Sequence, residues 1–353
     1  FKRASIGEIA TRMNEPAERV MELLASATKK MYAARLQRPT PYIDKTVYVG
    51  WNSLCVSAYL EAAKVLELND AKRFALRSLD RVLSSAWKPS AEADRACPEL
   101  AEGSVRSTLL HVVAYSDSQA EHREVPGMLD DYAFTALACL DAYEATSDLS
   151  YFKFARGITD AMIARFFDPT SGGFFDSEPA SDAARLGVLS TPRKPLQDSP
   201  TPAGNPMAAI ALIRIHHYTG DTSYRDKAEQ TLETFAQVAE QFGIFAATYG
   251  IAVLHFLEAA NQIVVIEAEA DQDAADKIYE AAVAPFAFGK AVIKLGSNQA
   301  VRENLPPALA ETIPSLPELK SGKSFAVFCS GSTCKPPIFT AAELRAALLA
   351  ASE

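Results

Sequence analysis

Two adjacent carboxylates, Asp130 and Asp131, stand at the predicted start of a helix, in the run LDDYAF. The helix dipole favours a carboxylate at this position, which accounts for one of the two as a cap. Because successive helical residues point about 100° apart, the other carboxylate faces elsewhere and could act as an acid, a base or an acceptor for a sugar hydroxyl. We therefore predict both as candidate catalytic residues, with Tyr132 beside them in the same site.

Three more segments place polar and aromatic side chains at helix starts or in turns. Trp51 could stack on a sugar face, or it could lie in the core while Asn52 or Ser53 caps the helix. GGFFD is typical of a turn that leads into a short strand, and QDSPTPAGNP places an N-cap residue before a helix-starting proline. The predicted catalytic residues are thus Asp130, Asp131 and Asp198, and the predicted substrate-binding residues are Trp51, Asn52, Tyr132, Phe175, Asp176 and Asn205.

No pattern in the sequence predicts a metal or a cofactor. The five histidines show neither H-x-H nor H-E-x-x-H spacing, and no phosphate-binding loop or dinucleotide fingerprint is present. His111, which precedes two valines, is a candidate for lining a pocket. Cys329 and Cys334 form a C-x4-C pair, which is wider than a redox C-x-x-C and offers zinc only two ligands. A structural turn and a redox pair both stay open for these cysteines.

The elements that must position these residues are mostly helices. Apolar residues recur at helical spacing from about Glu15 to Asn261, and alanine is abundant. Helices are expected over residues 16–36, 51–66, 70–87, 128–146, 149–166, 206–218, 222–241 and 246–261. The stretches 88–123 and 177–201 are less periodic and predict long loops with short strands, and loops of this length are often functional.

An internal repeat joins these helices in pairs. The repeated unit is a helix, a turn with an aspartate followed by a tyrosine, and a second helix. It occurs around Asp148 and Asp221, with a weaker copy at Asp70. The turns at Asp70 and Asp148 are 78 residues apart, and those at Asp148 and Asp221 are 73 residues apart. A helix pair cannot bury its own apolar face, so repeated pairs must pack on one another. The long period favours an α/α toroid of helical hairpins over a right-handed solenoid.

The character of the sequence changes after residue 261. Residues 262–267, 290–294 and 324–329 are apolar and β-branched and predict strands, while 273–284 and 340–350 predict helices. A strand, a helix and a strand within about 35 residues predict a βαβ unit. We expect two domains, a helical hairpin domain over 1–261 and a small α/β domain over 262–353.

The motifs WNSL, LDDYAF, GGFFD, TPAGN and AVFCSGSTCKPP, in this order, resemble the YyaL/spermatogenesis-associated protein 20 family. The resemblance implies an (α/α)6 toroid similar to those of six-hairpin glycosidases and N-acylglucosamine 2-epimerases, preceded in family members by a thioredoxin-like domain. Here no thioredoxin-like domain precedes the helices, and eight predicted helices are fewer than the twelve of a full toroid. We expect a mainly α fold of this toroid type, incomplete, with a small C-terminal α/β layer.

The composition of the chain limits the classes of partner that it is expected to bind. The formal net charge of −9 argues against a nucleic-acid partner, which requires a basic face. No run of about 18 apolar residues predicts a membrane partner, and scattered cysteines fit the reducing cytoplasm. The sequence predicts a sugar ligand; paired carboxylates would suit glycoside hydrolysis and a histidine–carboxylate set would suit epimerisation. The alternative is a non-catalytic platform that binds a thioredoxin-like domain or protein. Because the sequence begins at Phe1, we expect it to be the later part of a longer chain.

Overall fold

The structure is a computed structural model, and it describes residues 4–88, 107–113, 124–178, 191–331 and 333–351. The chain forms two compact units, Phe1–Lys45 and Thr46–Glu353. The first unit holds α1 (Ile6–Met13), which the sequence did not predict, and the predicted α2 (Ala17–Leu36). Ser5 caps α1 through a capping box with Glu8. All site residues predicted from the sequence belong to the second unit.

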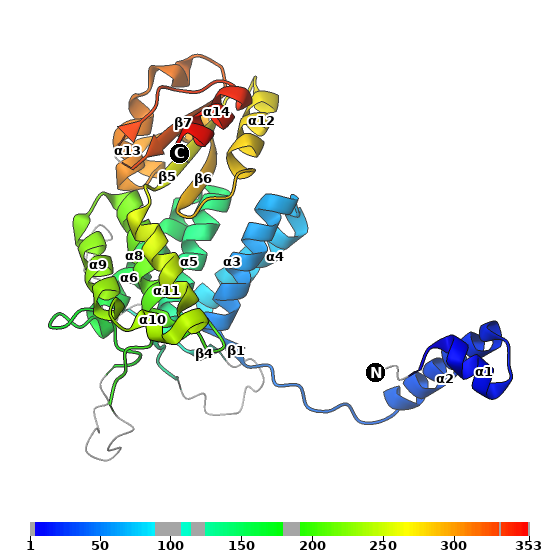
Figure 1. Cartoon of the computed structure of the whole chain (residues 1–353). Helices are drawn as coiled ribbons and strands as arrows, with labels where there is room; N and C mark the ends of the chain where they lie inside the picture. The colour runs from blue at the N-terminus through cyan, green and yellow to red at the C-terminus, as the bar shows by residue number, and fades with distance from the viewer. Residues whose placement is uncertain (1–3, 89–106, 114–123, 179–190, 332, 352–353) are drawn as a thin grey trace. The chain divides into compact units, whose positions relative to one another are not determined.

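The second unit is built from helical hairpins, shown in Figure 1. α3, α5, α8 and α11 pack side by side as an inner layer, and α4, α6 and α9 pair with them in sequence. This alternation confirms the predicted mainly α fold of α/α-toroid hairpins, with an α/β layer at the C-terminal end. The helices are α3 (Val49–Leu66), α4 (Asn69–Ala86), α5 (Leu129–Thr146), α6 (Leu149–Phe166), α8 (Gly204–Thr219), α9 (Thr222–Phe235) and α11 (Ala247–Leu257).

The repeated aspartates start the second helix of two hairpins. Asp148 accepts a hydrogen bond from the backbone N–H of Ser150, and Asp221 accepts one from that of Ser223, each at 2.9 Å. Each carboxylate therefore satisfies one of the free N–H groups of the helix it precedes. Asp70 lies inside the first turn of α4 rather than before it, which explains why this copy of the repeat is weaker.

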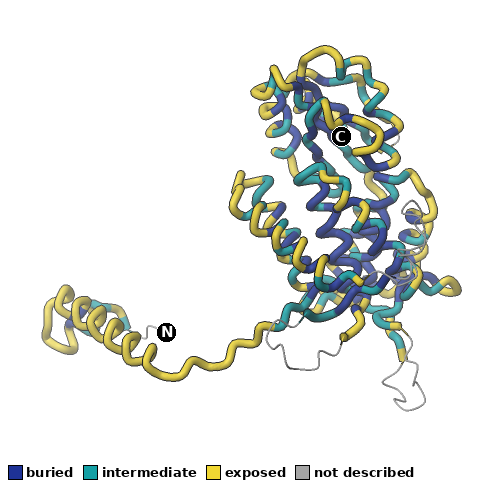
Figure 2. Tube along the Cα trace, turned by 180° about the vertical axis from the view of Figure 1, so that it is seen from behind, coloured by how far each residue is buried: buried dark blue, intermediate teal, exposed yellow. Residues whose placement is uncertain are grey.

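Two helices of the inner layer, α5 and α8, are buried along most of their length, because they carry apolar residues on most of their faces. In Figure 2 dark blue, the colour of buried residues, gathers in the central helices of this layer, and the hairpin at its edge is mostly yellow and teal. α5 is buried along nearly its whole length, and its small side chains let neighbouring helices approach closely. The N-terminal end of α5 carries Asp130 and Asp131, so a rigid core element holds these carboxylates.

The C-terminal layer is a four-stranded sheet of order β6-β5-β7-β8 with helices packed against it. β5 and β6 are parallel and α12 connects them, which confirms the predicted βαβ unit. Val264 and Ile266 face the core of the hairpins, whereas Ile263 and Val265 face α12 and α14. The elements are β5 (Asn261–Glu267), α12 (Gln272–Val283), β6 (Lys290–Gly296), α13 (Pro307–Thr312), β7 (Phe325–Ser330), β8 (Thr333–Cys334) and α14 (Ala341–Ala351).

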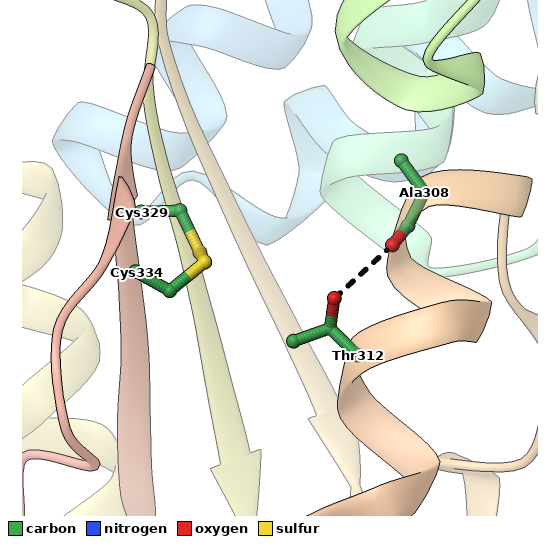
Figure 3. Close-up of a disulfide and its surroundings, with 4 residues drawn as sticks. All are labelled: Ala308, Thr312, Cys329 and Cys334. Atoms are coloured by element: carbon green, nitrogen blue, oxygen red, sulfur yellow. Dashed lines mark hydrogen bonds between the residues drawn. A yellow bond between two sulfur atoms is a disulfide. The ribbon is translucent and has the colours of Figure 1, made fainter. Parts of the chain in front are cut away.

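A disulfide joins Cys329 and Cys334 at the end of this sheet (Figure 3). The two residues are register partners on the antiparallel strands β7 and β8, and their Cα atoms lie 3.9 Å apart. The bond therefore links the two strands on either side of their turn, and it is compatible with both the structural and the redox interpretation of the C-x4-C pair. Cys139 is a free thiol buried in the core.

The predicted helix 222–241 ends early, at Phe235, and a short helix α10 (Ala239–Phe242) follows. Gly243 then takes a left-handed φ of 51° and separates α10 from a 3-10 turn and α11. By length and composition alone, the whole segment Ala239–Leu257 is the one described stretch that could cross a membrane. The expected lack of a membrane partner stays a prediction.

Candidate functional site

Two short strand pairs bring a loop against the starts of α3 and α5. β1 (Val47–Tyr48) pairs with β4 (Val112–Val113), and β2 (Trp87–Lys88) pairs with β3 (Thr108–Leu109). The carbonyl of His111 accepts the backbone N–H of Val49, the first residue of α3, at 2.9 Å. This backbone pairing places His111 at the N-terminal end of the inner helices.

Asp131 is the buried anchor of the site. Its Oδ2 accepts the backbone N–H of Met128 at 2.9 Å and lies 2.8 Å from Nδ1 of His111, while its Oδ1 accepts the backbone N–H of Gly50 at 2.9 Å. Burial raises the pKa of Asp131, although these hydrogen bonds act in the opposite direction. One carboxylate thus joins α3, the β4 loop and α5, and holds the imidazole in a defined orientation.

The carboxyl group of Asp130 lies against Gly204 of α8, whereas that of Asp131 lies against Gly50 of α3. Burial raises its pKa to about 6, with further contributions from the charges of Asp131 and Asp176 and an opposing one from His111. A carboxyl group of this pKa exists in both protonation states near neutral pH, as an acid–base catalyst requires. Asp131 thus caps the start of α5, as expected for one of the two carboxylates, and a catalytic role for Asp130 stays a prediction.

Aromatic rings surround this pair of carboxylates. Trp51 is 56% exposed, and its ring lies 4.7 Å from that of Tyr48, which in turn lies 5.6 Å from the imidazole of His111. A small hollow of about 60 Å³ is enclosed by these rings and both carboxylates. Such a volume holds a hydroxyl group or one or two waters rather than a whole sugar ring. A larger ligand would lie on the exposed indole of Trp51 and insert one of its groups into the hollow.

The GGFFD turn supports the site from α6. The carbonyl of Asp176 accepts the N–H of Leu129, at 3.0 Å, and so fixes the start of α5. Its side-chain Oδ1 accepts the backbone N–H of Arg193 at 3.0 Å. Phe175 is half-buried, with the ammonium of Lys194 5.0 Å from the centre of its ring. Both residues therefore shape the loop in this structure, and the field of Asp176 acts on Asp130 from a distance.

The structure gives four other predicted site residues structural roles. Tyr132 is 1% exposed and accepts the N–H of Leu109 with its hydroxyl, so it does not line the mouth. Asn52 donates to the carbonyl of Tyr48. Both carboxylate oxygens of Asp198 accept backbone N–H groups, those of Ala203 and Thr248.

Asn205 is fully buried and does not form the predicted N-cap. α8 begins one residue earlier, at Gly204, and the Asn205 amide instead pairs with both backbone groups of Phe174. The Asn205 amide therefore ties the GGFFD turn to the start of α8. Tyr132 and Asn205 are predicted to bind substrate, but both side chains are buried in this structure, so neither is placed at a surface that a substrate could reach.

Gly204 makes room for the carboxyl group of Asp130. A Cβ atom added at Gly204 would lie 2.3 Å from Oδ1 of Asp130 and 2.9 Å from Cδ2 of Leu129. We expect Gly204→Ala to displace the carboxyl group and to lower stability by about 1–3 kcal/mol, the usual cost of overpacking. Urea unfolding measures the change. Gly220→Ser would be a poor control, because Gly220 has a left-handed φ that strains any other residue. Gly250→Ala, where the added methyl meets open space, should change stability far less.

Among the residues that the structure describes, no group of three or more histidine, cysteine, aspartate or glutamate side chains could hold a metal ion. The pairing of His111 with Asp131 is the feature that sequence reasoning missed. Twenty residues separate them, and only the β1–β4 pairing shows that they meet.

Comparison with known proteins places the chain among its relatives. No family model matches it. It is 31% identical over 238 residues to spermatogenesis-associated protein 20 of Homo sapiens, and 29% identical over the same length to that of Mus musculus. The chain belongs to this family. The match covers 67% of the chain but only 28% of each of these relatives, so the chain spans well under half of their length.

A further relative by sequence is uncharacterized protein B0495.5 of Caenorhabditis elegans, which is 21% identical to this chain over 338 residues. The match covers 96% of this chain and 42% of that protein. Among solved structures, the chain is similar to a family 76 glycoside hydrolase α-mannanase of Bacteroides thetaiotaomicron, with a TM-score of 0.42 and 15% identity over 62% of this chain and 53% of that one. It is also similar to a cellobiose 2-epimerase of Bacillus thermoamylovorans, with a TM-score of 0.40 and 12% identity over 56% and 46% of the two chains.

Proposed function

We propose that the mouth formed by Trp51, His111, Asp130 and Asp131 binds a carbohydrate and transfers protons on it. The observation that carries the proposal is a carboxyl group with a pKa of about 6 beside an oriented imidazole and an exposed indole. An indole face suits the C–H face of a sugar, and a carboxyl group of this kind suits its hydroxyls.

The arrangement favours epimerisation or isomerisation over hydrolysis. With Nδ1 of His111 held by Asp131, the other ring nitrogen is the one that a ligand can meet. Asp130 and His111 would then act as acid and base on a carbon next to a carbonyl group. Glycoside hydrolysis needs two carboxyl groups that both face the substrate, and the oxygens of Asp131 are already committed to Gly50, Met128 and His111.

The test is a thermal-shift and calorimetry screen with mannose, glucose, N-acetylglucosamine and cellobiose. We expect at least one sugar to bind, and Trp51→Ala to weaken that binding by about tenfold, because a stacked aromatic ring contributes on the order of 1 kcal/mol. Tyr59→Ala is the matched control, since Tyr59 is an exposed aromatic residue on the same helix that packs on Phe74 away from the mouth.

The acid–base part of the proposal has its own readout. Wild type should exchange solvent deuterium into the bound sugar at the carbon next to the carbonyl group, and His111→Gln should lose this exchange while it still binds. Absence of any sugar shift in the screen would contradict carbohydrate binding. Binding without exchange would leave a binding module and would contradict the proton-transfer step.

A specific observation favours the alternative of an interaction platform. Large apolar side chains are exposed along the hairpin of α3 and α4, namely Tyr59, Val65, Leu66, Leu68 and Phe74. Exposed apolar groups of this extent are common at protein interfaces. Under this alternative no sugar would bind, and a thioredoxin-like domain added in trans would protect this hairpin from hydrogen exchange.

A further inference from the structure

The disulfide between Cys329 and Cys334 is a reactive group that the proposed function does not use. It lies at β8, the last strand in the sheet order β6-β5-β7-β8, so no described strand pairs with the outer side of β8. Cys334 is exposed, whereas Cys329 is half-buried and packs against the hydrophobic core of the hairpins. Exposed disulfides exchange with external thiols more readily than buried ones, because the reaction depends on access of the thiol.

The sheet decides from which side a thiol reaches this bond. Cys329 and Cys334 are register partners, and both side chains leave the same face of the sheet, so the S–S bond runs across the strands from β7 to β8 (Figure 3). On its other side Cys329 has Gln262 of β5 as its register partner. A thiolate attacks a disulfide sulfur in line with the S–S bond, from the side opposite the sulfur that leaves. The open edge therefore admits attack on Sγ of Cys334, with Sγ of Cys329 as the leaving group.

The strands around the disulfide are held together by hydrogen bonds as well. The backbone N–H of Lys335 donates to the carbonyl of Phe328 at 2.8 Å, and Ala326 and Ile338 exchange two backbone hydrogen bonds of 2.7 and 2.9 Å. The disulfide joins residues only 5 positions apart in the sequence, and closing so short a loop restricts the unfolded chain little. The S–S bond can therefore open while the segment after β8 stays paired with β7.

From this geometry we infer that Cys329 and Cys334 are a redox-active pair, which takes two electrons from an external dithiol while the domain stays folded. One thiolate of the dithiol attacks Sγ of Cys334, the S–S bond breaks, and Cys329 leaves as a thiolate that takes up a proton. The second thiolate of the dithiol then attacks the dithiol's own sulfur in the mixed disulfide and releases the thiolate of Cys334, which is protonated. The dithiol ends as a disulfide, and its two protons end on the two cysteines.

A dithiol suits this site better than a monothiol. After the first attack, the paired strands hold the thiol of Cys329 beside the mixed disulfide on Cys334. This thiol attacks back within the same molecule, where its effective concentration far exceeds that of a thiol in solution. A monothiol is therefore expelled, whereas a dithiol completes the reduction with its own second thiol. The inference goes beyond the proposed carbohydrate site, since the pair shares no residue with the mouth.

The test is reduction of the folded protein, followed by alkylation of free thiols and mass spectrometry of the peptides. At about pH 7.5 we expect about 1 mM dithiothreitol to reduce Cys329 and Cys334 within minutes, and 2-mercaptoethanol to need at least about a hundredfold higher concentration. Oxidised glutathione, added after removal of dithiothreitol, should restore the S–S bond. Two free thiols that persist after this treatment would overturn the inference.

Two other cysteines report on the folded state of the same sample. Cys55 is an exposed thiol and should be alkylated with or without dithiothreitol. Cys139 is a buried thiol whose pKa is raised by burial, so it should stay unlabelled as long as the core of the hairpins is folded. If Cys329 and Cys334 are reduced only in urea, or only in samples where Cys139 is labelled too, the disulfide is a structural cross-link and the inference fails.

Two single variants test which sulfur is attacked. Cys329→Ser leaves the exposed thiol of Cys334, and Cys334→Ser leaves the half-buried thiol of Cys329. We expect iodoacetamide to alkylate Cys334 at least about tenfold faster than Cys329, as measured on their peptides. The double variant should melt within about 5 °C of the oxidised wild type, because the strands stay paired. Equal rates for the two thiols, or a double variant that no longer unfolds cooperatively, would refute the assignment.

Discussion

Replacing Asp130 by asparagine is expected to stabilise the protein above neutral pH. Burial holds the pKa of Asp130 near 6 in the folded state, against an ordinary value of 3.8. Two pKa units correspond to about 3 kcal/mol, and partial exposure of the side chain reduces the expected gain to about 2 kcal/mol at pH 8. A residue that lowers stability while it lines a hollow with a histidine is expected of a functional site rather than of a structural cap.

The pH dependence fixes the sign of this effect. Below about pH 4 the carboxyl group is protonated in both the folded and the unfolded state, and its titration contributes nothing. Between about pH 4 and 6 the folded protein holds a proton that the unfolded chain has released, so the contribution to stability falls as the pH rises. Above about pH 6 the full cost persists. The advantage of Asp130→Asn should therefore grow from pH 4 to 6 and then stay constant.

Urea unfolding at several pH values from 4 to 8 measures this difference. Asp273→Asn is a matched control, because Asp273 is an exposed aspartate in the first turn of α12. Its effect at pH 8 should be much smaller than that of Asp130→Asn. A destabilised Asp130→Asn at pH 8 would mean that the carboxylate is held by favourable contacts and would remove the argument for its role as acid or base.

Replacing Asn205 by leucine is expected to cause the largest loss of stability. The Asn205 amide accepts the N–H of Phe174 at 2.6 Å and donates to the carbonyls of Phe174 and Pro195 at 2.9 and 3.0 Å. Leucine has a similar volume but no polar atoms, so these backbone groups would lose their partner while buried. At about 1–3 kcal/mol for each unsatisfied group, a loss of at least about 3 kcal/mol is expected.

The free energy of unfolding in urea, or the melting temperature, measures this loss. Asn304→Leu is the control, since Asn304 is exposed and makes one long hydrogen bond of 3.4 Å. A change below about 1 kcal/mol for Asn205→Leu would show that the GGFFD turn does not depend on this amide. The same variant should also reduce sugar binding indirectly, because Asp176 of that turn fixes the start of α5.

Local signals in the sequence were sufficient to place most of the helices and strands. α5 and α6 were predicted to within a residue or two of their observed bounds, because apolar spacing and the aspartate at their shared turn agree. α8 began before its predicted start because Asn205 bonds to a distant turn instead of capping the helix. A local rule cannot detect such a partner, since it lies 31 residues away.

The sequence by itself determined the hairpin repeat, the βαβ unit and the adjacency of Asp130 and Asp131, because periodicity, caps and neighbouring residues are local properties. Only the tertiary structure decided which of the two carboxylates is the hydrogen-bonded anchor and which has the raised pKa. Asp131 became an anchor because Gly50 and His111 come to it from other elements. Asp130 acquired its raised pKa because burial and two neighbouring carboxylates act on it together. Desolvation and long-range charge depend on the positions of residues far apart in the chain, and these positions exist only after folding.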